Sequence, residues 1–458
     1  MRNGDVSFWF AEAGGPPARR PALAGDLRAD VCIVGAGFTG LWTAYYLKRA
    51  RPSLNVVVLE SEFAGFGASG RNGGWLTGSF GWPSAPFEAA AGREAVRAMR
   101  RALLGSVDEV ISVARVEGID ADIRPADELI VATNPAQMQR LRADLAERLS
   151  WQVAEDRVRL IGAQEARDRV AIPALHGAMV IEGQARIQPA RLVCGLARVV
   201  ERQGTVIAEG TRVTGIRPGA ALTALGAVHA PVVLRATEGF TVGFAGHRRD
   251  LLPLNSAQIV TAPLPDAIWD RIGWQGFEIL GDAAHSYCYA QRTRDGRIAM
   301  GGRGLPYRYG SRFAVDGNVD AVTARLLRER LLRHFPMLAG VPVDHAWSGV
   351  LGVARDWAPA IAYDRATGLG AAGGYVGTGV ATSNLAGRTL ADLVLDRASD
   401  LVAMPWINRR TPRWEPEPLR WLGVRAVYAL YAAADRSEDR RGLDRTAIAG
   451  RLGHLLAG

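Results

Sequence analysis

The sequence predicts two kinds of architecture in one chain: an α/β domain of the Rossmann type, discontinuous along the sequence, and an inserted α+β domain built on an antiparallel sheet. Two observations carry this prediction. Near the N-terminus an apolar run, a glycine turn, a helical stretch and a second apolar run follow one another within about thirty residues. Farther along, strand-like runs are joined by a hairpin turn. The 458 residues, 48% of them hydrophobic, suffice for more than one core.

The first unit begins with Val31 to Val34, an apolar run that suits a buried parallel strand. Gly35, Gly37 and Gly40 then complete a G-x-G-x-x-G motif. In this motif the first glycine permits a tight turn, the second lets a pyrophosphate approach the backbone, and the third lets helix and strand pack closely. Apolar residues recur at helical spacing as far as Pro52. The motif therefore predicts that the helix N-terminus receives the phosphates of a dinucleotide.

A second apolar run, Val56 to Leu59, ends at Glu60, twenty residues after Gly40. An acid at this position accepts the hydrogen bonds of an adenosine ribose. Its negative charge would repel a 2′-phosphate, so we expect no NADP at this site. The unit alone leaves NAD and FAD as alternatives.

The stretch that follows, GFGASGRNGGWLTG at residues 65–78, has glycine at six of its fourteen positions. A nicotinamide dehydrogenase usually continues here with another helix of the same sheet, but this segment predicts almost no helix. Its small residues suit a backbone track along the pyrophosphate, ribityl chain and isoalloxazine edge of FAD. We assign to this track Gly67, Ala68, Ser69, Arg71, Asn72, Gly73 and Gly74.

By these residues the chain resembles the D-amino-acid-oxidase-like FAD-dependent oxidoreductases, and within them the gamma-glutamylputrescine-oxidoreductase-like branch. Early in the chain the resemblance lies in GFTGLWTAYYLK and GASGRNGG. Later blocks continue it in the family's order: PARLVCGLA, VVLRATEGFT, LPLNSAQIVTAPL, RDGRIAMGGR, HAWSGVLGVARDWAPAIA and GGYVGTGVATSNLAGRTLADLVL.

The resemblance implies FAD as the cofactor, and a glycine cluster followed by a helix in the last block. The N-terminus of that helix would lie at the pyrimidine edge of the flavin and stabilise negative charge there. Some relatives attach FAD covalently through a cysteine in the block here reading GVARDWAP, or through a histidine beside the glycine track. Neither occurs here, so we expect noncovalent FAD. Besides the track, the expected contacts are Gly35, Gly37, Phe38, Thr39, Gly40, Glu60, Ser61, Val213, Thr237, Gly239, Gly374, Tyr375, Gly377, Thr378 and Gly379.

The activity that the resemblance implies is oxidation of the C–N bond of an amine or amino acid to an imine, with hydride passing to flavin N5. Dioxygen or another electron acceptor would then reoxidise the flavin. Some relatives activate dioxygen with a lysine near N5, whereas the only lysine here, Lys48, lies on the first helix. Oxidase and dehydrogenase therefore both remain open.

Candidate catalytic residues follow the string GDAAH, residues 281–285. We expect a strand from His285 to Thr293 whose alternation puts His285, Tyr287 and Tyr289 on one face. This face would offer a titratable group and aromatic walls to an amine. For His285 alone, a hydrogen-bonded structural role is favoured slightly over a catalytic one. Arg303 is a candidate anchor for a substrate carboxylate, and Trp75 a candidate wall of the pocket, with core packing as its alternative.

GDAAH is also found in flavin-dependent monooxygenases that use NAD(P)H, where it precedes a turn beside the flavin. Here it runs into strand-like sequence, so a monooxygenase is the alternative enzyme. The alternative of another class is a flavin-binding partner protein without turnover.

The domain boundaries follow from changes in sequence pattern. We expect an N-terminal extension at 1–28, an FAD-binding domain made of 29–82, 186–248 and 346–400, and a substrate domain made of 83–185 and 249–345. A C-terminal helical tail follows at 401–458. We expect its aromatic face to dock on the body of the protein and make no membrane contact.

Composition narrows the remaining possibilities. The net charge is +9, but the arginines alternate with acids along the chain and gather in no basic face, so we expect no nucleic-acid partner. The three cysteines, Cys32, Cys194 and Cys288, form no C-x-x-C pair, and we expect no metal site and no disulfide. The N-terminus has no apolar stretch of signal-peptide length, so we expect a cytoplasmic enzyme.

Overall fold

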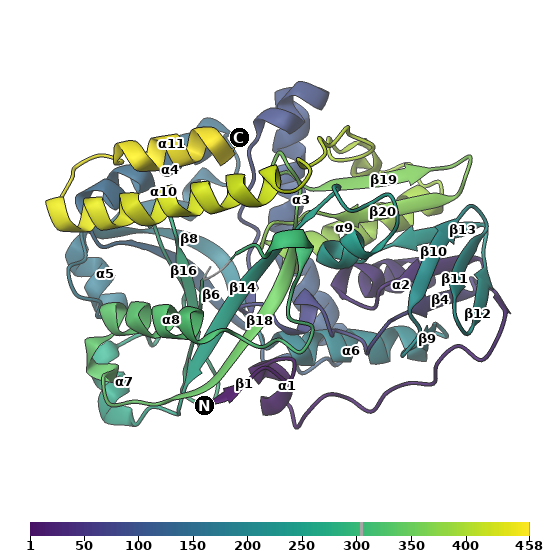
Figure 1. Ribbon diagram of the computed structural model, residues 1–458, viewed down its shortest axis with the longest axis horizontal. Coiled ribbons are helices and arrows are strands. Elements are labelled where there is room, and N and C mark those ends of the chain that lie inside the picture. The colour runs from purple at the N-terminus through teal and green to yellow at the C-terminus, as the bar shows by residue number, and fades with distance from the viewer. Residues whose placement is uncertain (303–305, 458) are drawn as a thin grey trace.

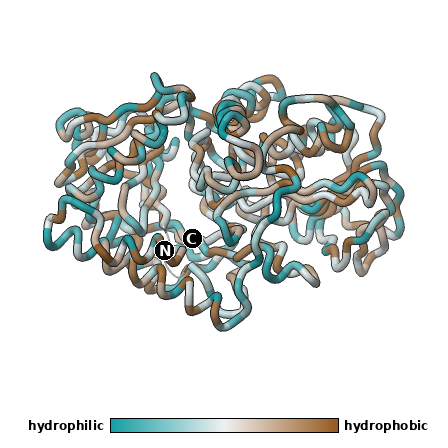
Figure 2. The backbone as a smooth tube through the Cα atoms, turned by 90° about the horizontal axis from the view of Figure 1, so that it is seen from above, coloured by the Kyte–Doolittle hydropathy of each residue, from teal (hydrophilic) through white to brown (hydrophobic). Residues whose placement is uncertain are grey.

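The computed structural model describes residues 1–302 and 306–457. Seen from above, the chain forms two lobes side by side (Figure 2). One lobe is built around a six-stranded, mostly parallel sheet and the other around a ten-stranded mixed sheet, so the predicted combination of an α/β and an α+β part is confirmed. The exact domain boundaries stay a prediction.

The six-stranded sheet brings together segments that lie far apart in the sequence. Its strand order is β19-β20-β13-β3-β4-β9, parallel except for the edge pair β19 and β20. Each central strand is a short apolar run, as expected for strands covered on both faces. The bounds are β3 Val31–Val34, β4 Val56–Leu59, β9 Val206–Ala208, β13 Val232–Arg235, β19 Ala360–Asp364 and β20 Leu369–Gly373.

Three helices cover one face of this sheet (Figure 1): α2 (Phe38–Ala50), α6 (Pro189–Arg202) and α9 (Gly379–Val394). Helix α2 is buried almost all round because α9 and α6 both pack against it. Gly387 of α9 permits this close approach, since a Cβ there would lie 2.6 Å from the Cβ of Trp42. The long helix α3 (Ala85–Val116), kinked at Gly92, packs on α9.

The second large sheet is mainly antiparallel and forms the other lobe. Its order is β1-β18-β14-β17-β16-β15-β6-β8-β5, with β7 beside β8. The RDG turn joins β16 and β17 as predicted. The bounds are β1 Arg2–Asn3, β5 Trp75–Leu76, β6 Arg124–Ala132, β7 Val158–Ile161, β8 Gly177–Arg186, β14 Leu252–Thr261, β15 Ile279–Asp282, β16 Cys288–Arg292, β17 Ile298–Gly302 and β18 Val343–Val353.

Smaller elements complete the two lobes. A four-stranded sheet, β10-β11-β12-β2, lies at the edge of the nucleotide-type lobe. Its strands are β2 Leu27–Arg28, β10 Val213–Arg217, β11 Ala220–Thr223 and β12 Gly226–His229. The other lobe carries the helices α4 Pro135–Ser150, α5 Ala163–Arg169, α7 Asp266–Ile272 and α8 Ala321–His334.

The predicted strand from His285 is wrong at its start, because β16 begins only at Cys288. Residues 283–287 form a turn in which only the N–H of Ala283 donates to a neighbouring strand, at Val131 O, and carboxylates accept from the N–H groups that follow. Asp282 accepts from the N–H of Cys288, and Asp435 accepts from those of His285 and Ser286. These side-chain acceptors replace the sheet hydrogen bonds that a longer strand would need.

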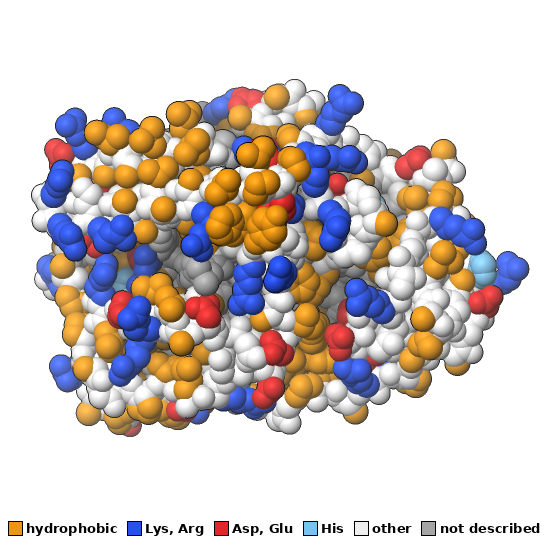
Figure 3. All heavy atoms as spheres, in the orientation of Figure 1, with side chains coloured by type: hydrophobic (Ala, Val, Ile, Leu, Met, Phe, Trp, Pro, Cys, Tyr) orange, Lys and Arg blue, Asp and Glu red, His pale blue; other side chains and the backbone are white. Residues whose placement is uncertain are grey.

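The C-terminal tail forms two helices, α10 (Leu419–Arg441) and α11 (Ile448–Ala457), which lie beside α4 at one end of the molecule (Figure 1). Val424, Val427 and Ala434 are buried against the body, whereas the aromatic residues of α10 are only half-buried. Apolar side chains gather on the outer face of these helices, with arginines around them (Figure 3). Over the described part of the chain, no helix has the length and apolar character needed to cross a membrane.

Candidate active site

A cavity of about 1230 Å³ lies between the two large sheets. It opens at the carboxyl ends of β3, β4 and β13, where open α/β sheets bind their ligands. From there it continues beneath the antiparallel sheet, where Trp75, Tyr287 and Tyr289 line it. One end thus suits a nucleotide, and the other forms a chamber for a second molecule.

The glycine turn at the nucleotide end has the predicted construction. Gly35 has a φ of +108°, which favours glycine, and a Cβ at Gly40 would lie 2.0 Å from the carbonyl oxygen of Gly35. Gly40 is therefore required for the helix to pack on the turn, as the motif predicts. The N–H of Phe38, in the first turn of α2, donates to Ser69 Oγ at 2.8 Å and joins the turn to the glycine-rich segment.

Glu60 lies directly after β4, with its carboxylate facing the cavity. The N–H groups of Ala36 and Glu62 donate to its two oxygens at 2.9 and 3.0 Å. Burial raises the pKa of Glu60, and these two hydrogen bonds offset part of that rise. Each oxygen keeps a lone pair that can accept from a ribose hydroxyl, so the geometry fits the predicted role.

The glycine-rich segment lacks side chains mainly because other parts of the protein pack closely against it. A Cβ at Gly70 would lie 2.4 Å from the ring of Phe10, and one at Gly73 would lie 2.7 Å from the ring of Tyr289. Gly74 has a φ of +71°, and a Cβ there would lie 1.9 Å from Gln291 Nε2. We expected the cofactor to require this closeness. The packing of the chain itself already requires glycine at these positions. The opposite side of the segment faces the cavity.

Four successive carbonyl groups of the segment accept hydrogen bonds from side chains behind it. Ser7 Oγ donates to Gly70 O, Trp9 Nε1 to Asn72 O, and Gln291 Nε2 to Gly73 O, each at 2.7 Å. The carbonyl of Arg71 accepts from Trp347 Nε1 at 2.9 Å and from Gln258 Nε2. The backbone track is thereby held rigidly.

Sequence reasoning did not foresee that the N-terminal extension takes part in this arrangement. Helix α1 (Phe8–Glu12) places Phe8, Trp9 and Phe10 in a buried cluster with Trp347, under the glycine-rich segment. The run of three aromatic residues was the available signal, since such a run on a short N-terminal segment needs a surface to cover it.

The N-terminus of α9 opens on the cavity, as the glycine cluster before it predicts. Tyr375 joins this end to the rest of the site: its hydroxyl lies 2.9 Å from Thr39 Oγ1, and its carbonyl accepts from Trp82 Nε1 at 3.0 Å. The N–H of Tyr375 donates to a carboxylate oxygen of Glu238 at 3.0 Å. Glu238, which the sequence did not single out, thus holds the turn before α9.

Burial raises the pKa of Glu238 to about 7. The carboxyl is then protonated in the folded protein at pH values where the unfolded chain, with a pKa near 4.5, has ionised it. Folding stability is therefore expected to fall as pH rises from about 4.5 to 7, by up to about 3 kcal/mol from this group. Glu238→Gln should flatten that part of the profile of unfolding free energy against pH, measured by urea denaturation. An unchanged slope would contradict the assignment.

Most residues that we assigned to the cofactor line this one cavity. They are Gly35, Gly37, Phe38, Thr39, Glu60, Ser61, Gly67, Ala68, Ser69, Arg71, Asn72, Gly73, Val213, Thr237, Tyr375, Gly377, Thr378 and Gly379. Four others, all in the described part of the chain, lie behind its wall: Gly40, Gly74, Gly239 and Gly374. These four glycines are required by close packing or by a positive φ, and their contact with the cofactor stays a prediction.

Of the catalytic candidates, Tyr287 and Tyr289 line the chamber, and Arg303 lies outside the described residues. His285 reaches the cavity wall, but its ring is held from behind. Its Nε2 lies 2.9 Å from Glu438 and 3.1 Å from Arg140, and its ring stacks on Tyr431. Burial opposes ionisation, yet the hydrogen bonds from His285 and Arg140 lower the pKa of Glu438 to about 2. These contacts favour the structural interpretation of His285.

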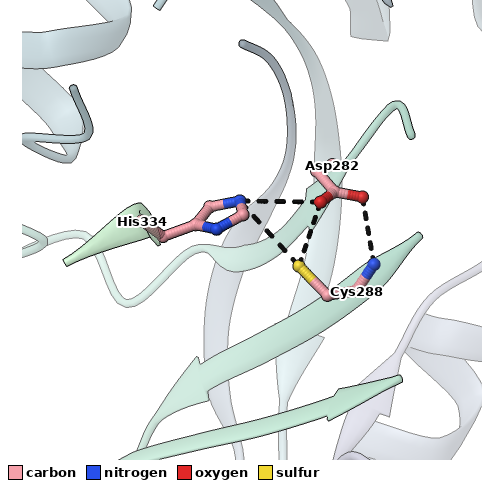
Figure 4. A group of neighbouring side chains, drawn as sticks. All are labelled: Asp282, Cys288 and His334. Atoms are coloured by element: carbon pink, nitrogen blue, oxygen red, sulfur yellow. Dashed lines mark hydrogen bonds and ion pairs between the residues drawn. The ribbon is translucent and has the colours of Figure 1, made fainter. Parts of the chain in front are cut away.

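A second buried cluster supports the same turn. Asp282, Cys288 and His334 point toward one another (Figure 4). Cys288 Sγ donates to Asp282 at 3.1 Å and lies 3.9 Å from His334 Nε2. Burial raises the pKa of Cys288 well above that of a free thiol and lowers the pKa of His334, so both groups are held neutral.

Sequence spacing did not predict this cluster, whose three residue types could ligate a metal. The guanidinium of Arg330, however, lies 3.7 Å from Asp282 and supplies a positive charge beside the carboxylate. The arrangement is complete as a hydrogen-bonded network that fixes both ends of the turn 283–287.

Several large or charged side chains near the cavity have structural partners. Trp347 is fully buried behind the glycine-rich segment, and Arg355 pairs with Glu415 and donates to the carbonyl of Ala457 in α11. Lys48 donates to the carbonyls of Pro52 and Leu54, which closes the loop after α2 away from the cavity. Trp75 lines the chamber, so the cavity-wall interpretation holds for it.

The chain is similar to curated and solved proteins over most of its length. It is 28% identical over 444 residues to gamma-glutamylputrescine oxidoreductase of Escherichia coli K12, covering 94% of this chain and 98% of that protein. Its fold is similar to L-amino acid deaminase from Proteus myxofaciens, with a TM-score of 0.69 over 89% of this chain and 97% of the other, at 16% identity. It is also similar to L-proline dehydrogenase from P. horikoshii, with a TM-score of 0.68 over 82% and 96%, at 18% identity.

The sequence pattern of one family covers most of the chain. It matches residues 30–393, from the glycine turn to the end of α9, and its description is FAD dependent oxidoreductase. The Glu60 carboxylate, the glycine turn and the glycine-rich track converge on one cavity of the required construction. FAD is therefore the noncovalent cofactor of this protein. The chain belongs to the DAO family, which is described as FAD dependent oxidoreductase.

Proposed function

We propose that this protein oxidises the C–N bond of an amine or amino acid. The observation that carries the proposal is the single cavity that joins the nucleotide end, at Glu60, to an aromatic chamber beneath the antiparallel sheet. The names of its relatives support the choice of substrate, since they include a gamma-glutamylputrescine oxidoreductase, an L-proline dehydrogenase and an L-amino acid deaminase.

Bound FAD supplies a two-electron acceptor for the hydride that leaves the carbon bonded to nitrogen. The residues of this chain have other tasks, namely to bind the substrate, orient it and exclude water. Trp75 and Tyr287 wall the chamber, and Trp75 is fixed because its Nε1 donates to the carbonyl of Ala290 at 3.2 Å. We assign a substrate-contacting role to Tyr287 and Tyr289. Arg303 keeps the role proposed from its sequence, which is to anchor a substrate carboxylate.

The same arrangement argues against the monooxygenase alternative. In this protein GDAAH forms the end of β15 and a turn in the ten-stranded sheet, whereas the nucleotide strands β3, β4 and β13 belong to the separate six-stranded sheet. The turn that leads into a helix beside the cofactor is formed instead by the glycine cluster before α9.

The test is anaerobic reduction of the purified holoenzyme, followed as bleaching of the flavin absorption band. A panel of primary amines, diamines, N-substituted amines and D- and L-amino acids is mixed with the protein, and NADH and NADPH are added in parallel. We expect at least one amine to bleach the band within seconds and neither nicotinamide to do so. Rapid bleaching by NAD(P)H alone would support the monooxygenase.

A yellow protein that no compound reduces would support a flavin-binding partner protein instead. The electron acceptor is then identified with the active amine, by comparing oxygen uptake with reduction of an artificial dye. Fast oxygen uptake would define an oxidase, and dye reduction without it a dehydrogenase.

A further inference from the structure

We propose that Glu128 forms a cation-binding subsite in the chamber and that the substrate carries an alkylammonium group that binds there. That the bound molecule is a substrate rests on the proposed function, whereas the subsite itself is argued from the residues of this chain alone. Glu128 was not among the residues singled out from the sequence. Its side chain is only 5% exposed, and it lines the cavity.

The strand that carries Glu128 aims it at the cavity. Along β6, Leu129 and Val131 pack into the core of the antiparallel lobe, while Glu128 and Ile130 alternate onto the cavity side. The register between β6 and β8 shifts between Ala126 and Glu128, directly before the carboxylate. Such irregularities redirect side chains and are frequent beside active sites.

Two hydroxyl groups fix the carboxylate. Thr77 Oγ1 donates to Glu128 Oε2 at 2.7 Å, and Ser79 Oγ donates to the same oxygen at 2.8 Å. Both donors are buried cavity residues: Thr77 lies near the end of the glycine-rich segment, and Ser79 follows directly after it. The carboxylate therefore sits where the cofactor track meets the antiparallel sheet, which is where a substrate must lie.

The carboxylate has polar support but, within the described part of the chain, no countercharge. Among residues 1–302 and 306–457, no arginine, lysine or histidine nitrogen forms an ion pair with Glu128. A buried carboxylate without a cationic partner is costly, and a bound cation removes that cost. Every other strongly buried acid described above has such a partner or several backbone donors, so Glu128 is poised for a ligand.

The neighbouring wall suits an alkylammonium ion. Ile130 is in register with Gly281, and a Cβ at Gly281 would lie 3.1 Å from the indole of Trp75. The absent side chain thus makes room for Trp75 beside Ile130, two residues along the same strand face from Glu128. An indole and an aliphatic side chain next to a carboxylate provide a π surface and apolar contact for the alkyl part and a charged acceptor for the N–H groups.

The test separates binding from turnover by using tert-butylammonium chloride as the probe. Its nitrogen-bearing carbon has no hydrogen, so it can bind but cannot lose a hydride. The holoenzyme is titrated with it and, in parallel, with the neutral isostere tert-butyl alcohol, and binding is read from the flavin spectrum and from calorimetry. We expect the ammonium to bind at least about tenfold more tightly than the alcohol.

Glu128→Gln should weaken binding of the ammonium by about 10- to 100-fold and leave binding of the alcohol unchanged. The matched control is Asp127→Asn. Asp127 directly precedes Glu128 on β6, and its carboxylate pairs with Arg169 on the other side of the strand. It removes the same charge and should leave both affinities unchanged. Equal affinity of Glu128→Gln and wild type for the ammonium would overturn the proposal.

Two further outcomes are decisive as well. If Glu128→Gln does not retain FAD, Glu128→Asp keeps a carboxylate at the site and should still prefer the ammonium to the alcohol, and absence of that preference overturns the proposal. If no amine bleaches the flavin but tert-butylammonium still binds through Glu128, the subsite stands and the proposed activity fails. If an amine bleaches the flavin but binding of tert-butylammonium does not depend on Glu128, the proposed activity stands and the subsite is refuted.

Discussion

Gly40→Ala should give a protein that purifies with little or no FAD. The added Cβ would lie 2.0 Å from the backbone oxygen of Gly35, and neither atom can rotate away. Helix α2 must therefore move off the turn, which misplaces the N–H groups that face the phosphates. We expect a destabilisation of about 1–3 kcal/mol from the forced contact and FAD binding weakened at least about tenfold. Flavin absorbance per protein and urea denaturation measure the two effects.

Gly105→Ala is the matched control for this substitution. Gly105 lies inside α3, and a Cβ there would meet no atom within 4 Å. Because alanine favours the helix over glycine, this variant should gain about 0.5–1 kcal/mol and keep its full FAD content. If Gly40→Ala behaved like Gly105→Ala, the close packing of helix and turn would be refuted as the reason for the third glycine of the motif.

Trp9→Ala should lower both the stability of the fold and the affinity for FAD. Trp9 is 2% exposed, packs against Trp347, and donates its indole N–H to the carbonyl of Asn72 in the glycine-rich segment. Removing a buried tryptophan side chain costs about 3–5 kcal/mol. The freed carbonyl also loosens the backbone track that faces the cavity. Thermal unfolding and equilibrium titration of the apoprotein with FAD measure the two losses.

Trp9→Phe separates the two effects. It keeps most of the aromatic contact but removes the indole donor, so we expect a loss of about 1–2 kcal/mol in stability and a measurable fall in FAD affinity. FAD affinity equal to that of the wild type in both variants would show that the N-terminal helix stabilises the fold without positioning the track.

Local sequence was sufficient to predict the nucleotide-binding half of the protein. The turn Gly35–Gly40, the acid at Glu60 and the glycine-rich segment occur within about fifty residues, and each has a conformational demand that only certain residue types meet. Short-range patterns of this kind can be recognised without knowing what packs against them. The family membership, the cofactor and the Rossmann-type sheet could therefore be predicted.

The substrate half could not be predicted to the same depth, because its residues acquire their roles from distant partners. His285 was assigned to a strand, but Asp435 and Glu438, about 150 residues later, hold it in a turn. Glu128 lies in a strand of mixed polarity, and its role can be recognised only when Thr77 and Ser79 are placed against it. No spacing along the chain reveals such pairs.

The sequence by itself determined that this chain binds FAD in a glycine-built cleft, since turns and helix ends are specified by the residues that form them. Only the tertiary structure decided why the track carries no side chains and which residues border the chamber. Phe10, Tyr289 and Gln291 pack against Gly70, Gly73 and Gly74, and Ser7 and Trp9 at the N-terminus donate to the carbonyls of Gly70 and Asn72. Packing between segments far apart in the chain sets these contacts, because close-packed interiors decide which backbone can approach which side chain.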